Sequence, residues 1–256
     1  MRFFFSPLDA GFLELEDALR QAAGLGMGLE LPFDLFEAAA PLLPKAEDLK
    51  ALGARYGVAF TLHLPFVDLN LASLFPKSFE AALSRTKDGL AFAEAVGAGV
   101  AVLHTGSVPF RHPRVVEFAW KRLSEALDAL KPFAVPVAVE NLALDERDLL
   151  QGPDDLKRLL DAHPEYGFCL DFSHAFVEGG EARVRDYLDR LGDRLLHLHL
   201  NDTPGDRDRH LPVGEGSIPF DRLRPARLPA TATFEVRGDA LALDSSRERL
   251  RKAWDI

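Results

Sequence analysis

The chain has 256 residues, of which 47% are hydrophobic and 27% charged, and its formal net charge is −10. This composition is typical of a folded globular protein and excludes a disordered chain, a collagen and a disulfide-rich scaffold. No stretch is apolar over the roughly 18 residues that a membrane span needs, so no membrane partner is expected. The excess of acid also disfavours a protein that tracks a long nucleic acid, because lysine and arginine neutralise phosphate backbones.

The N-terminal segment and the cysteine content bear on localisation. A short apolar run at residues 3–5 is soon followed by acidic residues, which is unlike a secretory signal. Cys169 is the only cysteine, so the chain cannot form an internal disulfide. Both features predict a cytoplasmic protein.

Short apolar runs alternate with amphipathic segments from one end of the chain to the other. The runs predict strands at residues 2–6, 27–31, 58–64, 99–104, 136–140, 167–172, 195–200 and 231–236. Between them, hydrophobic residues fall at helical spacing, as at Val116, Ala119, Trp120 and Leu123. Eight strands separated by helices predict an α/β fold, a single (β/α)₈ TIM barrel over residues 1–256. A doubly wound open sheet is the alternative, but no GxGxxG follows the first predicted strand.

Histidines and carboxylates gather at the ends of the predicted strands, where barrel enzymes carry their chemistry. Strands three to eight each end in such a residue, and the segments after strands six and seven add three more. The nine residues are His63, His104, Glu140, Asp171, His174, His199, Asp208, His210 and Glu235. Imidazoles and carboxylates are ligands of Zn²⁺ and Mn²⁺. Nine are too many for one ion, whereas three ions sharing carboxylates would use them all.

Any one of these histidines alone would more often be a capped or solvated residue than a ligand, so the metal prediction depends on the six strands together. His197 and Cys169 share strand faces with His199 and Asp171, and we expect them in the core or behind the ligands. His112 and His163 precede prolines near helix ends, and we expect both at the surface.

The runs HLPFVDLNLAS, HTGS, EN, CLDFSHAF, HLND, DRHLPVGEG and FE, in this order along the chain, resemble endonuclease IV. That family of metal-dependent abasic-site DNA repair enzymes belongs to the xylose isomerase-like barrel superfamily. The resemblance implies three divalent ions, Zn²⁺ or Mn²⁺, and hydrolysis of a phosphoester, with Glu140 and Glu235 as catalytic groups. It implies one ion held by His63, His104 and Glu140, a second by Glu140, Asp171, His199 and Glu235, and a third by His174, Asp208 and His210.

The chain departs from that family in its substrate-contacting loops. Phe66 stands where the family usually has tyrosine, no basic residue lies between Glu30 and Lys45, and the segment LALDERD at 142–148 replaces a glycine-containing stretch. Arg207 and Arg209 flank the ligands of the seventh loop and are candidates for phosphate contact, or for a solvated pair. We therefore expect a small phosphorylated or sugar-like substrate more than abasic DNA.

Two other functions remain open. A sugar isomerase or epimerase of the same superfamily would need one ion, at Glu140, Asp171, His199 and Glu235, with the two glutamates as acid and base and His174 on the substrate. Such an enzyme has no need of His63, His104, Asp208 and His210 together, and no lysine ends a predicted strand as a xylose isomerase-type hydride shift requires. The other alternative is a metal-binding protein without turnover. The sequence does not specify an oligomeric state.

Overall fold

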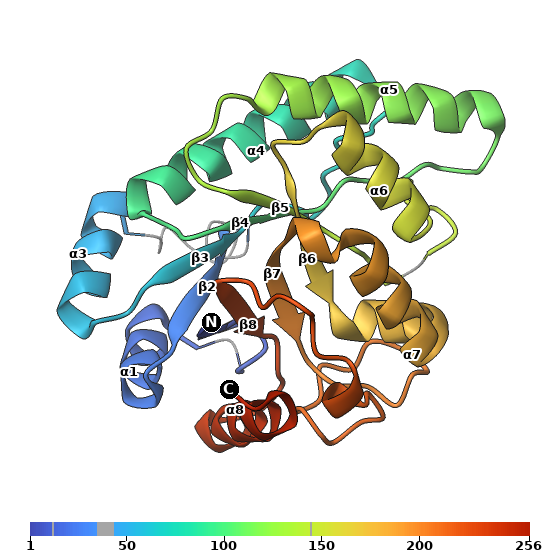
Figure 1. Cartoon of the computed structure of the whole chain (residues 1–256). Coiled ribbons are helices and arrows are strands. Elements are labelled where there is room, and N and C mark those ends of the chain that lie inside the picture. The colour runs from blue at the N-terminus through green and yellow to red at the C-terminus, as the bar shows by residue number, and fades with distance from the viewer. Residues whose placement is uncertain (12, 35–43, 144) are drawn as a thin grey trace.

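The computed structural model describes residues 1–11, 13–34, 44–143 and 145–256. Its eight parallel strands form a closed barrel in chain order, with helices outside it (Figure 1), as predicted. Each strand lies within two residues of its predicted ends. The strands are β1 Arg2–Phe5, β2 Gly28–Pro32, β3 Phe60–His63, β4 Ala101–Leu103, β5 Val137–Glu140, β6 Gly167–Asp171, β7 Leu195–Leu200 and β8 Thr231–Phe234.

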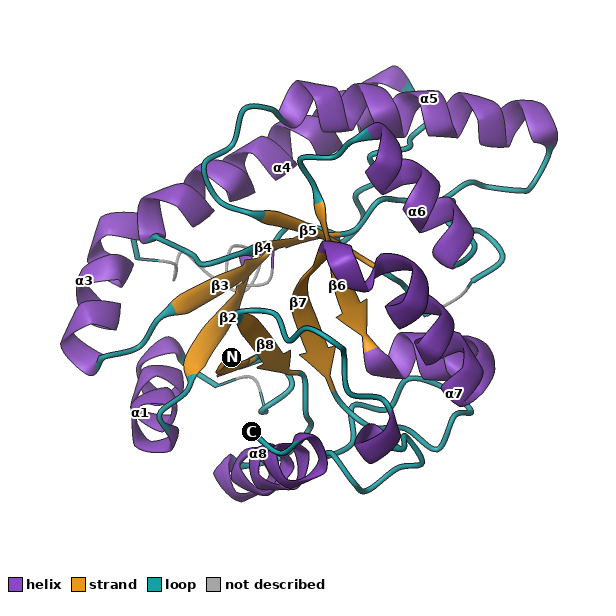
Figure 2. Cartoon of the chain, in the orientation of Figure 1, coloured by secondary structure: helices purple, strands orange, loops and turns teal. Residues whose placement is uncertain are grey.

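The helices have clear local stop and start signals. Helices α4, α5 and α6 begin with proline, whose fixed φ and missing N–H suit the first helical position. Helices α1, α3 and α4 end at glycines in the left-handed conformation, which lets the cap N–H reach the last turn. The α-helices that lie within the described residues (Figure 2) are α1 Leu15–Leu25, α3 Ala46–Tyr56, α4 Pro76–Val96, α5 Pro113–Leu130, α6 Pro153–Ala162, α7 Phe172–Leu191 and α8 Ala240–Trp254.

The barrel interior is packed in layers of different polarity. Val102, Ala138 and Cys169 form a small apolar cluster, so Cys169 is the buried core residue that the sequence predicted. Another set of buried side chains is polar and joins strands that are not neighbours in the barrel. This set, which we call the interior polar layer, consists of Glu30, Thr61, His197 and Thr233.

The segment between β7 and β8 is organised around Asp202. The backbone of this residue pairs with that of Leu211, and its carboxylate accepts hydrogen bonds from the N–H groups of Thr203, Gly214 and Ile218. A Cβ atom at Gly216 would lie 2.3 Å from Asp202 Oδ1, so only glycine allows this approach. Buried Asp202 thus gathers the loop that carries two of the predicted ligands.

The structure corrects one prediction about histidines. His112 is exposed as expected, but His163 is only 4% exposed, so its placement at the surface was wrong. Its Nε2 lies 3.0 Å from Ser124 Oγ, and the chain turns immediately after it, with the N–H of Tyr166 bonded to its carbonyl. The ring of Tyr166 lies edge-on to that of His163, with centroids 6.3 Å apart, so the imidazole lies between α5 and the segment that leads into β6.

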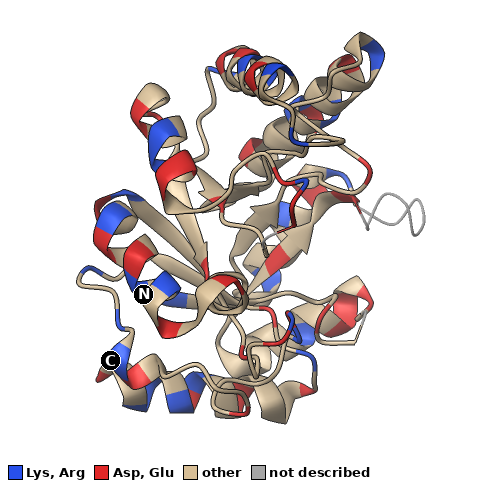
Figure 3. Cartoon of the chain, turned by 90° about the vertical axis from the view of Figure 1, so that its right-hand side faces the viewer, with Lys and Arg blue, Asp and Glu red and all other residues tan. Residues whose placement is uncertain are grey.

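Charged residues are spread over the outside of the barrel. Figure 3 shows basic and acidic residues mixed along the helices. Among the described residues, no helix is long and apolar enough to cross a membrane.

Candidate metal centre

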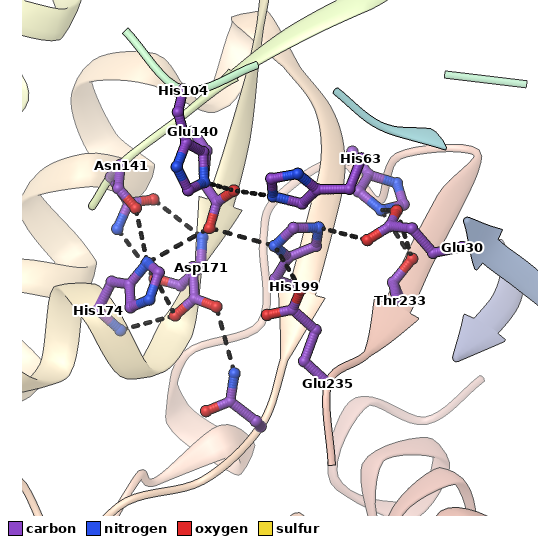
Figure 4. Close-up of polar contacts among 12 residues, drawn as sticks. Glu30, His63, His104, Glu140, Asn141, Asp171, His174, His199, Thr233 and Glu235 are labelled. Atoms are coloured by element: carbon purple, nitrogen blue, oxygen red, sulfur yellow. Dashed lines mark hydrogen bonds and ion pairs between the residues drawn. The ribbon is translucent and has the colours of Figure 1, made fainter. Parts of the chain in front are cut away.

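Glu140, at the end of β5, is the centre of the predicted ligand set (Figure 4). Its Oε2 lies 3.1 Å from His104 Nε2 and 3.5 Å from His63 Nε2. Its Oε1 lies 3.2 Å from His199 Nδ1 and 3.3 Å from His174 Nδ1. One carboxylate therefore faces four histidines from four strand ends, as a bridging ligand would.

The remaining ligands extend the cluster on both sides of Glu140. Asp208 Oδ2 lies 2.6 Å from His210 Nε2 and 3.5 Å from His174 Nε2, which brings the third implied group together. On the other side, Glu235 Oε1 lies 3.5 Å from His199 Nδ1. Asp171 contacts the cluster through His174, whose backbone N–H donates a hydrogen bond to Asp171 Oδ1 at 2.6 Å. The structure thus brings all nine predicted residues into one contiguous cluster at the carboxyl end of the barrel.

Backbone carbonyls orient three of the histidine rings. His63 Nδ1 lies 3.0 Å from the carbonyl of Leu64, His174 Nδ1 2.9 Å from that of Asn141, and His210 Nδ1 2.8 Å from that of Glu235. A carbonyl oxygen only accepts, so Nδ1 carries the proton in each contact and Nε2 stays free for another partner.

His210 holds its orientation at a cost in backbone conformation. Its φ is +53°, a left-handed value that is unfavourable for a residue with a side chain. The N–H of Arg237 donates to its carbonyl at 2.8 Å and helps to hold it there. Strain of this kind persists where the surrounding contacts fix the residue, as they do at this end of the cluster.

Two asparagines fix the position of Asp171. The side chain of Asn141 exchanges two hydrogen bonds with the backbone of Asp171, at 2.9 and 3.0 Å. Asn201 Nδ2 donates to the Asp171 carboxylate at 3.2 Å. These contacts explain the Glu-Asn and His-Leu-Asn motifs, because each places an amide beside a ligand.

The ionisable groups shift one another strongly. Burial opposes the charge on Glu140, but His199 and His104 outweigh it and hold the pKa of Glu140 well below its usual value. Burial raises the pKa of Glu235 to about 8. Burial lowers the pKa of His210, but Asp208 and Asp9 outweigh it and raise that pKa to about 11. In the absence of metal, protons on the histidines therefore balance the carboxylates.

The cluster fits divalent metal ions. Ligand atoms of His63, His104 and Glu140 lie within 4.8 Å of one another, as do those of Glu140, Asp171 and His174. His199 Nδ1 and Asp208 Oδ1 are buried and have no hydrogen-bond partner among the described residues. A metal ion would satisfy both atoms and replace the protons.

Sequence reasoning missed two carboxylates at this end of the barrel. Asp9, in the loop after β1, has its Oδ1 3.1 Å from His210 Nδ1. Glu30, inside β2, has its Oε1 3.0 Å from His199 Nε2. Glu30 had a detectable signal, because it is the one charge within the otherwise apolar segment Gly28–Pro32.

The two candidate phosphate-contacting arginines lie beside the cluster on the loop after β7. Arg207 is exposed. Arg209 forms an ion pair with Asp206, so a phosphate would compete with that carboxylate for its guanidinium. Their contact with substrate stays a prediction.

A cavity of about 150 Å³ adjoins the cluster of predicted ligands beside His104. Phe66, which replaces the usual tyrosine, lines it and packs with ring centroids 4.8 Å from His63 and 4.9 Å from His104. Among the described residues that line it, Asp148 is the only carboxylate, and burial raises its pKa. No basic residue lies between Glu30 and Lys45 in the sequence. This segment is largely outside the described residues.

A model of the family described as xylose isomerase-like TIM barrel matches residues 19–252 of the sequence. The chain belongs to the xylose isomerase-like TIM barrel family. It is 30% identical over 220 residues to the probable endonuclease 4 of Streptomyces coelicolor, covering 76% of this chain and 74% of that protein. It is 27% identical over 223 residues to the fructoselysine 3-epimerase of Escherichia coli O157:H7, covering 82% of this chain and 80% of that protein.

A solved structure is also similar to this chain over nearly its whole length. The TTHB071 protein of Thermus thermophilus, soaked with ZnCl₂, superposes with a TM-score of 0.76 at 30% identity, covering 98% of this chain and 96% of that one. The chain is thus related to both endonuclease 4 and a sugar epimerase. Family membership supports a metal-binding enzyme and leaves hydrolysis and epimerisation as separate possibilities.

Proposed function

We propose that this protein is a metal-dependent hydrolase of phosphoester bonds with three divalent ions, Zn²⁺ or Mn²⁺, at the carboxyl end of the barrel. The observation that carries the proposal is the group formed by His174, Asp208 and His210, in contact with Glu140 through His174. A one-metal epimerase does not need this group. Endonuclease 4 as a relative supports the same chemistry.

The residues of the cluster would have different roles in hydrolysis. Divalent ions bound here would make a water acidic enough to attack at neutral pH and would neutralise charge on the phosphoryl group. Glu140, which faces four histidines, would be a ligand shared between ions. Glu235 directly follows β8 and its Oε1 lies 3.5 Å from His199 Nδ1, so it is placed to take up and return a proton.

The surroundings of the cluster favour a small substrate. The part of the cavity beside His104 that described residues line contains no lysine or arginine, and the chain has a net charge of −10. Tracking a duplex would need one cation for each neutralised phosphate. We therefore propose a small phosphoester, with abasic DNA as the less favoured substrate.

The test is metal analysis combined with hydrolysis assays on the purified protein loaded with Zn²⁺ or Mn²⁺. Substrates would be bis(p-nitrophenyl) phosphate, p-nitrophenyl phosphate and an abasic-site duplex at low salt. The wild type should hold three ions and hydrolyse at least one substrate. His210→Ala should lose one ion and most of the activity. A fully loaded wild type with a single ion would contradict the three-metal proposal.

Epimerisation of a sugar is the second candidate, and two observations favour it. Glu140 and Glu235 both approach His199 Nδ1, at 3.2 and 3.5 Å, and could act as acid and base. The described lining of the cavity, which holds no lysine or arginine, also suits an uncharged sugar. An epimerase that uses one ion should keep its activity on free ketoses in His210→Ala, which separates the two functions. Three bound ions without turnover of any of these substrates would instead favour a metal-binding protein.

A further inference from the structure

Glu30 belongs to none of the three implied metal groups, yet it touches one of their members. It lies in the middle of β2 and is 1% exposed. Its Oε1 lies 3.0 Å from Nε2 of His199, on the ring edge opposite to Glu140 and Glu235 (Figure 4). A buried carboxylate in this place needs partners, because an isolated buried charge is very costly.

The interior polar layer supplies those partners and fixes which oxygen each of them uses. Thr61 and Thr233 donate their hydroxyls to Oε2 of Glu30, at 2.9 and 3.0 Å. His197 Nε2 lies 3.2 Å from the same oxygen. With Oε2 occupied from β3, β7 and β8, Oε1 of Glu30 and Nε2 of His199 face each other at 3.0 Å, and neither buried atom has a hydrogen bond to any other described residue.

Strand register holds this arrangement in place. Glu30 is the partner of Thr61 across β2 and β3, and His199 is the partner of Thr233 across β7 and β8. The four side chains therefore project from fixed positions on the barrel wall. Glu30 spans the interior to reach His199, since β2 and β7 are not neighbours.

His199 differs from the histidines that backbone carbonyls orient. His63, His174 and His210 each have a carbonyl at Nδ1, which leaves Nε2 free. His199 has no such carbonyl contact among the described residues, and it has the Glu30 carboxylate at the opposite nitrogen, Nε2. A carboxylate at Nε2 attracts the single proton of a neutral imidazole to that nitrogen, so Nδ1 presents its lone pair toward Glu140 and Glu235.

We propose that Glu30 is a positioning residue of the metal centre, which keeps the His199 proton on Nε2 and so makes Nδ1 the metal ligand. Thr61, Thr233 and His197 hold the carboxylate in the orientation that this requires. The inference depends on the proposed metal centre, but it is independent of the substrate.

The deciding variant is Glu30→Gln, which has the shape of the native residue. The two threonine hydroxyls favour the amide oxygen at the Oε2 position, so the NH₂ group faces Nε2 of His199. A donor at that nitrogen favours the other tautomer, with the proton on Nδ1 where the metal should bind. Loss of such an outer partner typically weakens metal binding about 10–100-fold.

Glu178→Gln is the matched control. Its side chain is 1% exposed, forms an ion pair with Arg183 at 2.9 Å and accepts from the Tyr187 hydroxyl at 3.0 Å. Its hydrogen bond and ion pair among the described residues join it to Tyr187 and Arg183, neither of which is a predicted ligand. It therefore reports what the loss of a buried carboxylate does to the fold alone.

Zn²⁺ affinity is measured by chelator competition, and histidine tautomers by long-range ¹H–¹⁵N spectra of the zinc-loaded protein. We expect one of the three zinc sites of Glu30→Gln to weaken by about 10–100-fold, the cost of a lost outer partner. The other two sites, and all three in Glu178→Gln, should keep wild-type affinity. In the wild type, His199 should carry its proton on Nε2.

Unchanged zinc affinity in Glu30→Gln would overturn the proposal, as would a wild-type His199 protonated on Nδ1. Equal weakening of all three sites would mean a structural role and would overturn it too. If Glu30→Gln does not fold, the wild-type spectrum decides, together with Thr61→Val, which should weaken the same site by a smaller factor. A wild type that binds no zinc would contradict the proposed metal centre itself. Three zinc sites of wild-type affinity in both variants would contradict only the proposed role of Glu30.

Discussion

Two clusters of histidine and carboxylate lie in this barrel, and they balance their charges differently. At the carboxyl end of the strands, carboxylates face histidines, with Glu140 in contact with four of them. Away from those strand ends, where α5 ends and the turn leads into β6, Asp128 and Glu165 lie near His163. There Lys131 forms ion pairs with both carboxylates.

The lysine is the informative difference. The ammonium group of Lys131 lies between Asp128 and Glu165 and balances their negative charge. That cluster therefore needs no metal ion. Among the described contacts of Glu140, Asp171 and Glu235, no lysine or arginine plays that part. Histidine protons balance those acids in the metal-free chain, and divalent ions can replace the protons. A set of ligand-type residues thus predicts a metal site only when no side-chain cation already fills it.

The largest test of this comparison is Glu140→Gln. The change removes one charge from the carboxylate that faces four histidines, so we expect loss of the ions that Glu140 would share. Activity should fall by more than about a hundredfold, the upper end of the cost of losing an outer partner. Metal content and turnover of the best substrate measure the effect. Wild-type metal content in this variant would contradict the bridging role.

The next test is the pH dependence of thermal stability without metal. The pKa of His210 is raised to about 11 and that of Glu235 to about 8, so both groups hold their protons more tightly in the folded chain. The stabilisation from His210 is complete below about pH 6.5, the unfolded pKa of histidine, and is lost as the pH rises toward 11. The contribution of Glu235 begins to fall above about pH 4.5, its ordinary pKa, and is lost as the pH rises through about 8. The melting temperature of chelator-treated protein should therefore fall between about pH 6.5 and 9.

Zinc should reverse that trend. Deprotonated ligands bind metal better, so the stabilisation by Zn²⁺ should grow as the pH rises. At a free zinc concentration a thousandfold above its dissociation constant, binding adds about 4 kcal/mol, or roughly 10 °C in a chain of this size. Differential scanning fluorimetry with and without zinc checks both trends. A metal-free protein that becomes more stable toward about pH 9 would show that the histidine protons do not stabilise it.

The smallest effect is expected at the other cluster, from Lys131→Met. Its ammonium is partly exposed, and exposed ion pairs contribute little. We expect a change in melting temperature of less than about 3 °C. Zinc stoichiometry and activity should equal those of the wild type. An additional zinc site in this variant would sharpen the comparison, since it would show that the lysine alone excludes the metal there.

Much of the fold and the predicted ligand set followed from local patterns. All eight strands were found within two residues of their observed ends, because doubly covered parallel strands are short apolar runs between turn residues. The sequence predicts that the nine candidate ligands lie close together, because the carboxyl ends of parallel strands meet at one end of a barrel. Their roles as ligands still await the metal measurements.

What the tertiary structure alone decided are contacts between residues far apart in the chain. Glu30 and Thr233 are 203 positions apart and meet only because the barrel closes, which places β2 and β8 on either side of β1. The burial of His163 depends on its contacts with Ser124 of α5 and with Tyr166, and the nearby ion pair of Lys131 joins the end of α5 to Glu165. Sequence periodicity reports which face of an element is apolar. It does not predict which residue an apolar or polar face will contact across the barrel. The contact of Glu30 with His199 could therefore be identified only from the tertiary structure.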